Sequence, residues 1–380
     1  MFHIKAKLIF RLLSIIAIHK TIFAPNFNTM YKFLVLLICS FLYFGVQSAN
    51  SQNNSKKVKI VSLGFYNLEN LFDTVDDTLI NDEEFLPNGA RAWTDERYQE
   101  KQANMAYVIS QIGIQDVKAG LSLLGVSEIE NRKVLEDLVV QPSIKDRNYQ
   151  IIHYDSPDAR GVDVGLLYNP NHFAPLLSRP IPLVNFEDGK RRYTRDVLYV
   201  KGLLDDDTVH VMVNHWPSRG GGPITANHRN NGAKLCRSVV DSIFQVVPDA
   251  KIFVMGDLND DPTDESLKSY LRSVNNIKDI RKTGMYNPYE DMFRRGLGSN
   301  AYRDAWSLFD QIIISKGVTD KKSKGYQFFK ANIFNKLFLV QPNGQYKGYP
   351  FRTFSGDTYQ SGYSDHFPTY IYLIKGLGAG

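Results

Sequence analysis

Two short polar segments contain the residues whose types and spacing are best suited to chemistry. Asp257 and Asn259 come directly after one apolar run, and Asp365 and His366 lie just before another. A strand displays polar side chains at the rim of its sheet where the apolar run ends, so we expect both segments at one site. Carboxylate, amide and imidazole groups at this density need partners when they are buried, and a divalent cation with a phosphate would satisfy all of them. The two segments therefore indicate metal-assisted phosphoester chemistry.

Other polar residues follow strand-like runs in the same way. In chain order the candidate clusters are Asn67 with Glu69, Glu128, Asn214 with His215, Asp257 with Asn259, Asp310, and Asp365 with His366. Any one of them alone is as well explained by a helix cap, an Asx-turn, a solvated carboxylate or a hydrogen-bonded structural histidine. Six clusters in one chain favour a shared site. Asn, Glu and Asp oxygens suit Mg²⁺, Mn²⁺ or Ca²⁺, while the lack of a Cys/His ligand cluster argues against structural zinc.

The elements that must position these clusters alternate between strand and helix patterns. Strand patterns occupy residues 58–66, 121–126, 149–154, 162–168, 197–204, 209–214, 251–255, 309–315 and 370–373. Helix patterns begin near Thr94, Asn131 and Asn227, where apolar residues recur at helical spacing. The acidic turn 205–207 predicts a hairpin between the strands that flank it. We infer an α/β fold and, since repeats and internal linkers are lacking, one catalytic domain over residues 58–380.

Composition and charge narrow the class of protein. The chain has 380 residues, of which 43% are hydrophobic and 22% are charged, and these proportions are typical of a globular protein and not of a disordered one. The formal net charge is +5, but the whole excess comes from five Lys and Arg residues before residue 50, where no Asp or Glu occurs. The rest of the chain is neutral, so any attraction to a polyanion must be local.

We interpret residues 1–49 as an N-terminal leader and residues 50–57 as a short linker. Met30 opens a segment with a basic residue, the apolar run 33–46 and small residues at its exit, which is typical of a secretory signal. We expect translation to start at Met30 and the mature protein to be exported to the periplasm or the exterior. A membrane anchor is the alternative, although each apolar run is shorter than the ~20 residues that a span needs. Without the leader Cys236 is the only cysteine, which excludes an intramolecular disulfide.

In their order along the chain and in their residue types, the clusters resemble the motifs of the endonuclease/exonuclease/phosphatase superfamily. This superfamily includes deoxyribonuclease I, abasic-site endonucleases, neutral sphingomyelinases and inositol polyphosphate 5-phosphatases. The resemblance covers residues 58–374, its best matches are at 256–259 and 364–366, and the other clusters stand in the expected order. It implies a deoxyribonuclease I-like, four-layered α/β sandwich. In that fold two mixed sheets pack face to face with helices outside, and the site lies at one rim.

The resemblance also implies a set of metal ligands. Glu128 would be the principal ligand of Mg²⁺, with Asn67, Glu69 and Asp365 next to the metal directly or through water. Two positions depart from the family pattern: Ser127 precedes Glu128 where many members have Gln, and Glu69 replaces an Asp found in some branches. Both departures leave the oxygen chemistry of the site unchanged.

A second set of residues would carry the reaction, again as the resemblance implies. Asp257 would orient or deprotonate the attacking water, and Asn259 would hold a phosphoryl oxygen. His366, held by Asp310, would contact the scissile phosphate, and His215 would be a second donor on the phosphate side. Physically, the metal and a protonated imidazole would neutralise the charge that develops on the phosphoryl and leaving oxygens.

Two basic regions bear on the substrate. Residues 321–352 contain seven basic and no acidic residues, interleaved with aromatic ones, and a second basic patch lies at 190–195. Such regions could grip a nucleic-acid backbone with its unpaired bases, or lie on an anionic lipid surface. Core aromatics with solvated lysines explain the first region equally well. Arg160 and Arg219 are further candidates to contact phosphate, with surface salt bridges as the alternative.

We therefore favour a secreted, Mg²⁺-dependent phosphodiesterase of the endonuclease type, which hydrolyses nucleic acid by in-line attack of an activated water. The alternative is a phospholipid or inositol-phosphate phosphohydrolase on the same scaffold, with a phosphorylated small molecule or a lipid as its substrate. A third reading is a catalytically silent binding protein of this fold, which the filled catalytic positions disfavour. We infer no obligate protein partner.

Overall fold

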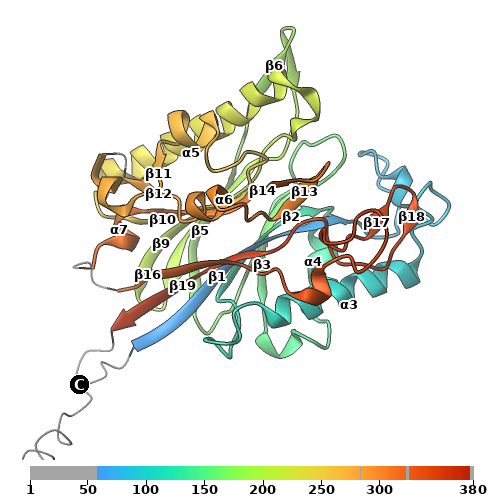
Figure 1. Ribbon diagram of the computed structural model, residues 1–380, viewed down its shortest axis with the longest axis horizontal. Helices are drawn as coiled ribbons and strands as arrows, with labels where there is room; N and C mark the ends of the chain where they lie inside the picture. The colour runs from blue at the N-terminus through green and yellow to red at the C-terminus, as the bar shows by residue number, and fades with distance from the viewer. Residues whose placement is uncertain (1–57, 283, 322–324, 377–380) are drawn as a thin grey trace, which may run out of the picture. The chain divides into compact units, whose positions relative to one another are not determined.

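Two mixed β-sheets pack face to face in the computed structural model, which describes residues 58–282, 284–321 and 325–376 (Figure 1). Helices cover the outer face of each sheet, so the fold has four layers. The predicted leader and linker lie outside the described residues. Within the described ranges, no helix is both long enough and apolar enough to cross a membrane.

The first sheet has six strands, with β1 and β2 at its centre. In spatial order they are β16 (Gln327–Ile333), β19 (Thr369–Gly376), β1 (Val58–Leu71), β2 (Leu123–Ile129), β4 (Asp163–Tyr168) and β3 (Gln150–His153). β1 runs parallel to β2 and antiparallel to β19. A parallel pair needs a crossover connection, and here the crossover contains helix α3 (Asp95–Gln111). The C-terminal ends of β1 and β2 consequently lie at the same edge of the sheet.

The second sheet has seven strands and the same kind of parallel centre. In spatial order they are β11 (Ser273–Val274), β12 (Met285–Tyr286), β15 (Asp310–Ser315), β10 (Lys251–Asp257), β9 (Asp207–His215), β8 (Val197–Leu204) and β5 (Phe173–Ile181). β9 runs parallel to β10, with α5 (Pro223–Val246) in the crossover, and β15 runs antiparallel to β10. The start of β15 therefore lies beside the ends of β9 and β10.

Alternate residues of the central strands form the apolar layer between the sheets. Val61, Leu63 and Phe65 of β1 belong to one buried cluster with Phe253 and Met255 of β10. The residues between them face the helices, because successive side chains of a strand point to opposite faces of its sheet. This alternation explains why the central strands read as continuous apolar runs: both of their faces are buried.

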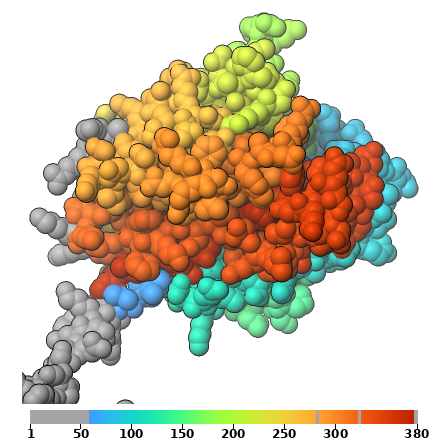
Figure 2. All heavy atoms as spheres, viewed as in Figure 1, coloured from blue at the N-terminus to red at the C-terminus, as the bar shows by residue number. Residues whose placement is uncertain are grey.

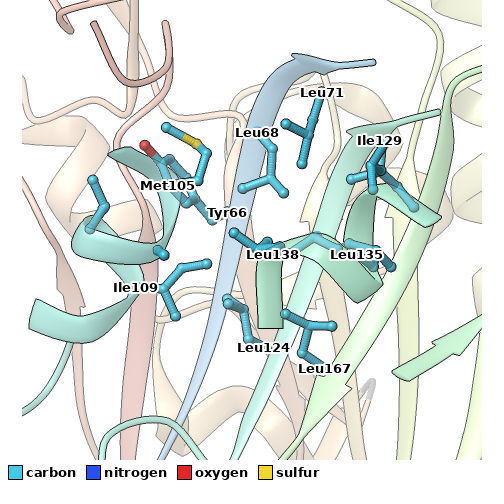
Figure 3. Packing of buried hydrophobic residues seen from close by; sticks show 14 of the residues in the cluster. Tyr66, Leu68, Leu71, Met105, Ile109, Leu124, Ile129, Leu135, Leu138 and Leu167 are labelled. Carbon is cyan, nitrogen blue, oxygen red and sulfur yellow. The ribbon is translucent and has the colours of Figure 1, made fainter. Parts of the chain in front are cut away.

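Helices α3 and α4 (Arg132–Val139) cover the first sheet. Figure 3 shows Met105 and Ile109 of α3 and Leu138 of α4 packed around Tyr66 and Leu124 of the sheet. Helix α5 covers the second sheet in the same way, through residues that include the fully buried Cys236. These two apolar layers hold the strand ends at fixed positions.

The remaining elements are short. They are the strands β6 (Asn185–Glu187), β7 (Lys190–Arg192), β13 (Asn300–Tyr302), β14 (Ala305–Ser307), β17 (Phe354–Ser355) and β18 (Thr358–Tyr359), and the helices α6 (Glu290–Arg294) and α7 (Lys316–Thr319). Single helical turns lie at Glu83–Phe85, Lys145–Arg147, Arg219–Gly221, Ser266–Tyr270, Ile277–Lys282 and Leu337–Leu339. Each of the three strand pairs forms a separate two-stranded hairpin.

The predicted four-layered α/β sandwich is confirmed. Thr94 and Asn131 cap α3 and α4 through their side chains, as expected of these residue types, and the 205–207 turn joins β8 to β9. The sequence patterns missed the short strands β11 and β12, the strands of the three hairpins and two longer strands, β5 and β16. β5 is an edge strand that contains Pro175 and Pro180, and β16 is an edge strand with a bulge and little burial, so neither carries a clear apolar period.

Candidate active site

The strand ends bring the predicted residues of the two sheets to one edge. Asn67 lies on β1, next to the bulged end of β2, in the first sheet. On the second sheet Asp257, the last residue of β10, pairs in register with His215 on β9 and with Asp310 on β15. Residues distant in sequence thus lie side by side because of strand register and not because of any local motif.

The backbone leaves regular β geometry where the two central strands of the first sheet reach this edge. The β1–β2 ladder shifts its register between Asn67 and Leu71, and the β2–β4 ladder does so on either side of Glu128. Glu69 and Glu128 have positive φ angles of 48° and 56°, in the left-handed region that residues other than glycine rarely adopt. Asn259, which follows the end of β10, also has a positive φ angle, of 49°. These bulges re-aim the carboxylates into the site, and such strain is common at functional sites.

Asn67 connects the two sheets at the centre of the site. Its buried amide donates hydrogen bonds to Glu128 Oε1 at 3.2 Å and to Asp257 Oδ2 at 3.0 Å. The second Glu128 oxygen accepts from the backbone N–H of Asn70 at 3.0 Å. Asn67 therefore fixes the positions of two carboxylates that approach from different sheets.

His215 and Asp257 form a buried pair with altered proton affinities. His215 Nε2 lies 3.6 Å from Asp257 Oδ2 and 3.7 Å from Glu128 Oε1. Burial, with the nearby charges of Arg195 and Arg160, lowers the pKa of His215 well below its usual value, so the imidazole is neutral. Burial is also the main reason that the pKa of Asp257 rises to about 7, a value suited to a group that accepts a proton near neutral pH.

His366 and Asp310 form the shortest charged contact of the site. His366 Nδ1 lies 2.7 Å from Asp310 Oδ2, and the fully buried Asp310 also accepts a hydrogen bond from Ser299 Oγ. Burial opposes the imidazolium, but the carboxylates of Asp310 and Asp257 outweigh it and raise the pKa of His366 well above its usual value. The structure thus joins the two residues that the family resemblance paired, and presents a protonated imidazole to the site. Their catalytic roles stay predictions.

Glu69 and Asp365 are held by a residue that the sequence reasoning did not select. Arg352 Nε lies 3.0 Å from Glu69 Oε1, and Arg352 Nη2 lies 3.1 Å from Asp365 Oδ2. The other Glu69 oxygen accepts from the backbone N–H of Thr353 at 2.7 Å. One arginine therefore pairs with both carboxylates, and its charge also interacts with that of Glu128. Arg352 was counted only as part of a basic stretch, and its place in the site depends on tertiary structure.

Lys101 is a second residue that was missed. It is fully buried in α3, donates to Thr353 Oγ1 at 2.6 Å and to the carbonyl of Tyr363, and lies 4.0 Å from Glu69 Oε2. Burial lowers its pKa to about 8. A signal existed in the sequence: Lys101 precedes Met105 by one helical turn, on the apolar face of the helix.

Several other candidates have structural partners. The Asn259 side chain donates to the carbonyl of Trp216 at 2.9 Å, and Asn214 accepts from the Trp216 ring nitrogen at 3.1 Å. Arg219 is paired with Asp261 and two further aspartates, as the salt-bridge alternative to phosphate binding predicted. Of the aromatic residues in 321–352, Tyr326 and Phe334 are buried in the core and Phe328 and Phe338 pack against it, whereas Phe329 and Tyr346 are exposed.

The donor set at the centre of the site fits a divalent cation. Glu128, His215 and Asp257 each offer a ligand atom within 4.8 Å of the others. Among the described residues, the basic groups within 4.0 Å of the Glu128 and Asp257 carboxylates are the imidazoles of His215 and His366. Since His215 is neutral and the protonated His366 lies 3.9 Å from Asp257 Oδ2, Glu128 has no cationic partner within 4.0 Å among the described residues, and Mg²⁺, Mn²⁺ or Ca²⁺ bound through oxygen ligands would supply that charge.

The comparisons with known proteins agree with this architecture. The family model described as "Endonuclease/Exonuclease/phosphatase family" matches residues 62–375. No curated protein matched the chain.

Several solved structures are similar to this chain at low sequence identity. A humanized variant of D. rerio TDP2 is 13% identical with a TM-score of 0.50, and the match covers 83% of this chain and 98% of that one. An endonuclease/exonuclease/phosphatase family protein from Bacteroides thetaiotaomicron is 14% identical over 86% and 98% of the two chains, with a TM-score of 0.49. A mannosyl-6-phosphatase from the same species is 14% identical over 82% and 99%, with a TM-score of 0.48.

Proposed function

The chain belongs to the endonuclease/exonuclease/phosphatase family, and on that premise we propose that it is a metal-dependent phosphodiesterase of the nuclease type. Members of the family are in general hydrolytic phosphoesterases that use divalent metal ions. The observation that carries the proposal is the convergence of Glu128 from one sheet with Asp257 and His215 from the other, beside the charged pair of His366 and Asp310. A metal, a proton acceptor and a cationic donor would then lie within one site.

Each residue of the site would have a distinct role in hydrolysis. Glu128, with His215, would hold Mg²⁺, which when bound supplies positive charge to a phosphoryl oxygen. Asp257 accepts a proton from the attacking water, because burial brings its pKa near neutrality. Protonated His366 donates a hydrogen bond to a phosphoryl or leaving oxygen, and Asp310 keeps the imidazole charged and oriented. Asn67 positions the two carboxylates.

Nucleic acid is our proposal for the substrate. The hairpin of β6 and β7 projects from the second sheet (Figure 1), and the three basic residues of β7 are all exposed. Phe186 and Tyr193 flank them and expose 61% and 53% of their surfaces. Cations beside exposed aromatic rings suit a phosphate backbone with stackable bases. Consistent with the apolar run of the leader, we also propose that the protein is exported.

A panel assay tests the proposal. Plasmid DNA, RNA, sphingomyelin vesicles and inositol phosphates are each incubated with the protein in Mg²⁺ and in excess EDTA. We expect hydrolysis of nucleic acid that stops in EDTA, and its loss in Asp257→Asn excludes a contaminating enzyme. Hydrolysis of vesicles or inositol phosphates alone would instead support the alternative substrates. Full activity in EDTA would refute the metal-dependent mechanism.

A further inference from the structure

A pocket of about 350 Å³ opens beside the candidate active site. Glu69, Asn70 and Arg352 line it on the side of the site, and Arg91 and Arg160 line it elsewhere. The pocket thus borders the candidate active site at Glu69 and Arg352, and the backbone N–H of Asn70 donates to Glu128 Oε2. Figure 2 shows the surface where the segments around β17 and β18 (red) meet the segment that follows β1 (blue to cyan). These are the segments that supply most of the lining.

The aromatic residues that line this pocket are packed against neighbouring side chains. Phe85 and Phe354 line it and are almost fully buried. Phe85 stacks on Phe72 with ring centroids 4.4 Å apart, and Trp93 packs against Phe354 at 5.9 Å. Arg91 lies over the Phe354 ring at 5.0 Å. A preformed cavity of this kind loses little conformational entropy when it binds a ligand.

The three arginines of the pocket differ in how far their charges are already neutralised. Arg352 is paired with two carboxylates of the site, and Arg91 lies 3.4 Å from Glu84 and 3.3 Å from Asp357. The carboxylate nearest to Arg160 is Asp158, at 4.0 Å, and it already binds the guanidinium of Arg195 at 3.0 Å. The Arg160 side chain is 54% exposed. Arg160 is therefore the cation of the pocket best placed to bind an anion.

We propose that this pocket binds a terminal phosphate of a nucleic-acid strand, with Arg160 as the contacting residue, so that the enzyme acts next to a strand end. The inference rests on the proposed nuclease function and specifies it. A guanidinium recognises phosphate through two parallel hydrogen bonds. A cavity near the lower end of the ~300–1,000 Å³ range of ligand pockets holds one nucleotide-sized unit and not a continuous duplex.

Binding without turnover tests this inference independently of catalysis. Single-stranded oligonucleotides of one sequence, ending in a 5′-phosphate, a 3′-phosphate or only hydroxyls, are titrated in EDTA by fluorescence anisotropy. We expect the wild type to bind one of the phosphate-ended strands about tenfold more tightly than the hydroxyl-ended strand, and Arg160→Gln to lose this preference. The slope of log affinity against log salt should fall by about 0.7 for the lost contact. Arg160→Lys should keep part of the preference.

Arg132→Gln is the matched control, because Arg132 is also 54% exposed but pairs with Glu136 on α4. An equal loss of preference in both variants would mean a general charge effect and would overturn the inference. So would equal wild-type binding of all three strands, or a preference that survives Arg160→Gln. Discrimination without EDTA-sensitive hydrolysis would refute the proposed function and leave the pocket assignment standing. EDTA-sensitive hydrolysis without any preference for phosphate-ended strands would support the proposed function and refute the pocket assignment.

Discussion

At the scale of single residues, the pair of His366 and Asp310 carries the clearest prediction. His366→Ala should lower kcat by a factor on the order of 10² or more, because the site loses its protonated donor. Asp310→Asn should also lower kcat, since the imidazole loses the carboxylate 2.7 Å away that keeps it charged. Steady-state kinetics on a nucleic-acid substrate measure both effects, and thermal unfolding checks that the variants stay folded.

The double variant decides whether the two residues act as one unit. If Asp310 works only through His366, the double variant should be little worse than the worse single variant. Multiplicative defects would show instead that the two residues act independently.

At the scale of elements, the close approach of β9 and β10 sets the site. A Cβ added to Gly256 would lie 2.3 Å from the backbone oxygen of Asn214, so Gly256→Ala must push apart the strands that deliver His215 and Asp257. We expect a loss of about 1–3 kcal/mol in the free energy of unfolding, with reduced activity, measured by urea denaturation. Gly376→Ala is the control, because a Cβ there meets no atom within 4 Å. Equal stability of the two variants would contradict this packing.

The pair of strands β8 and β9 contributes a pH dependence of stability. His210 is buried beside Tyr199 and opposite Lys201, and burial together with the Lys201 charge lowers its pKa to about 4. Between pH 6.5 and 4 the unfolded chain therefore binds the proton more readily, so the free energy of unfolding falls as the pH is lowered, by at most about 3 kcal/mol. His210→Gln should lose less over the same range, and taking the difference between the two proteins cancels the other titrating groups. Parallel curves would rule out this role for His210.

At the scale of the whole described unit, a bound metal should join the two sheets. Glu128 comes from the first sheet and Asp257 from the second, and the basic group within 4.0 Å of both carboxylates is the neutral imidazole of His215. Mg²⁺ at 100 times its dissociation constant should stabilise the fold by about 2.7 kcal/mol and raise Tm by on the order of 5 °C. Glu128→Gln should weaken this effect and recover it partly at high Mg²⁺, whereas the exposed Glu136→Gln should not. If Mg²⁺ leaves the Tm of the wild type unchanged, the proposal that this site binds the metal is wrong.

The sequence patterns by themselves indicated the α/β class and selected most residues of the site, whereas the four layers were implied by the family resemblance. Apolar periodicity located the central strands and the helices, because strands buried on both faces and helices with one apolar face leave strong local patterns. Asp257, His215 and Asp310 could be selected because each lies where such a strand begins or ends. The fold class follows from the same alternation.

Only the tertiary structure decided which of these residues touch. The bulges at Glu69 and Glu128 leave no mark on the apolar period, since their positive φ angles are imposed by neighbouring strands. Arg352 and Lys101 reach the site through contacts more than 250 residues apart in sequence, as do the walls of the pocket that holds Arg160. Local patterns record burial and backbone preference, whereas pairing between distant charges depends on strand register and on how the loops fold back.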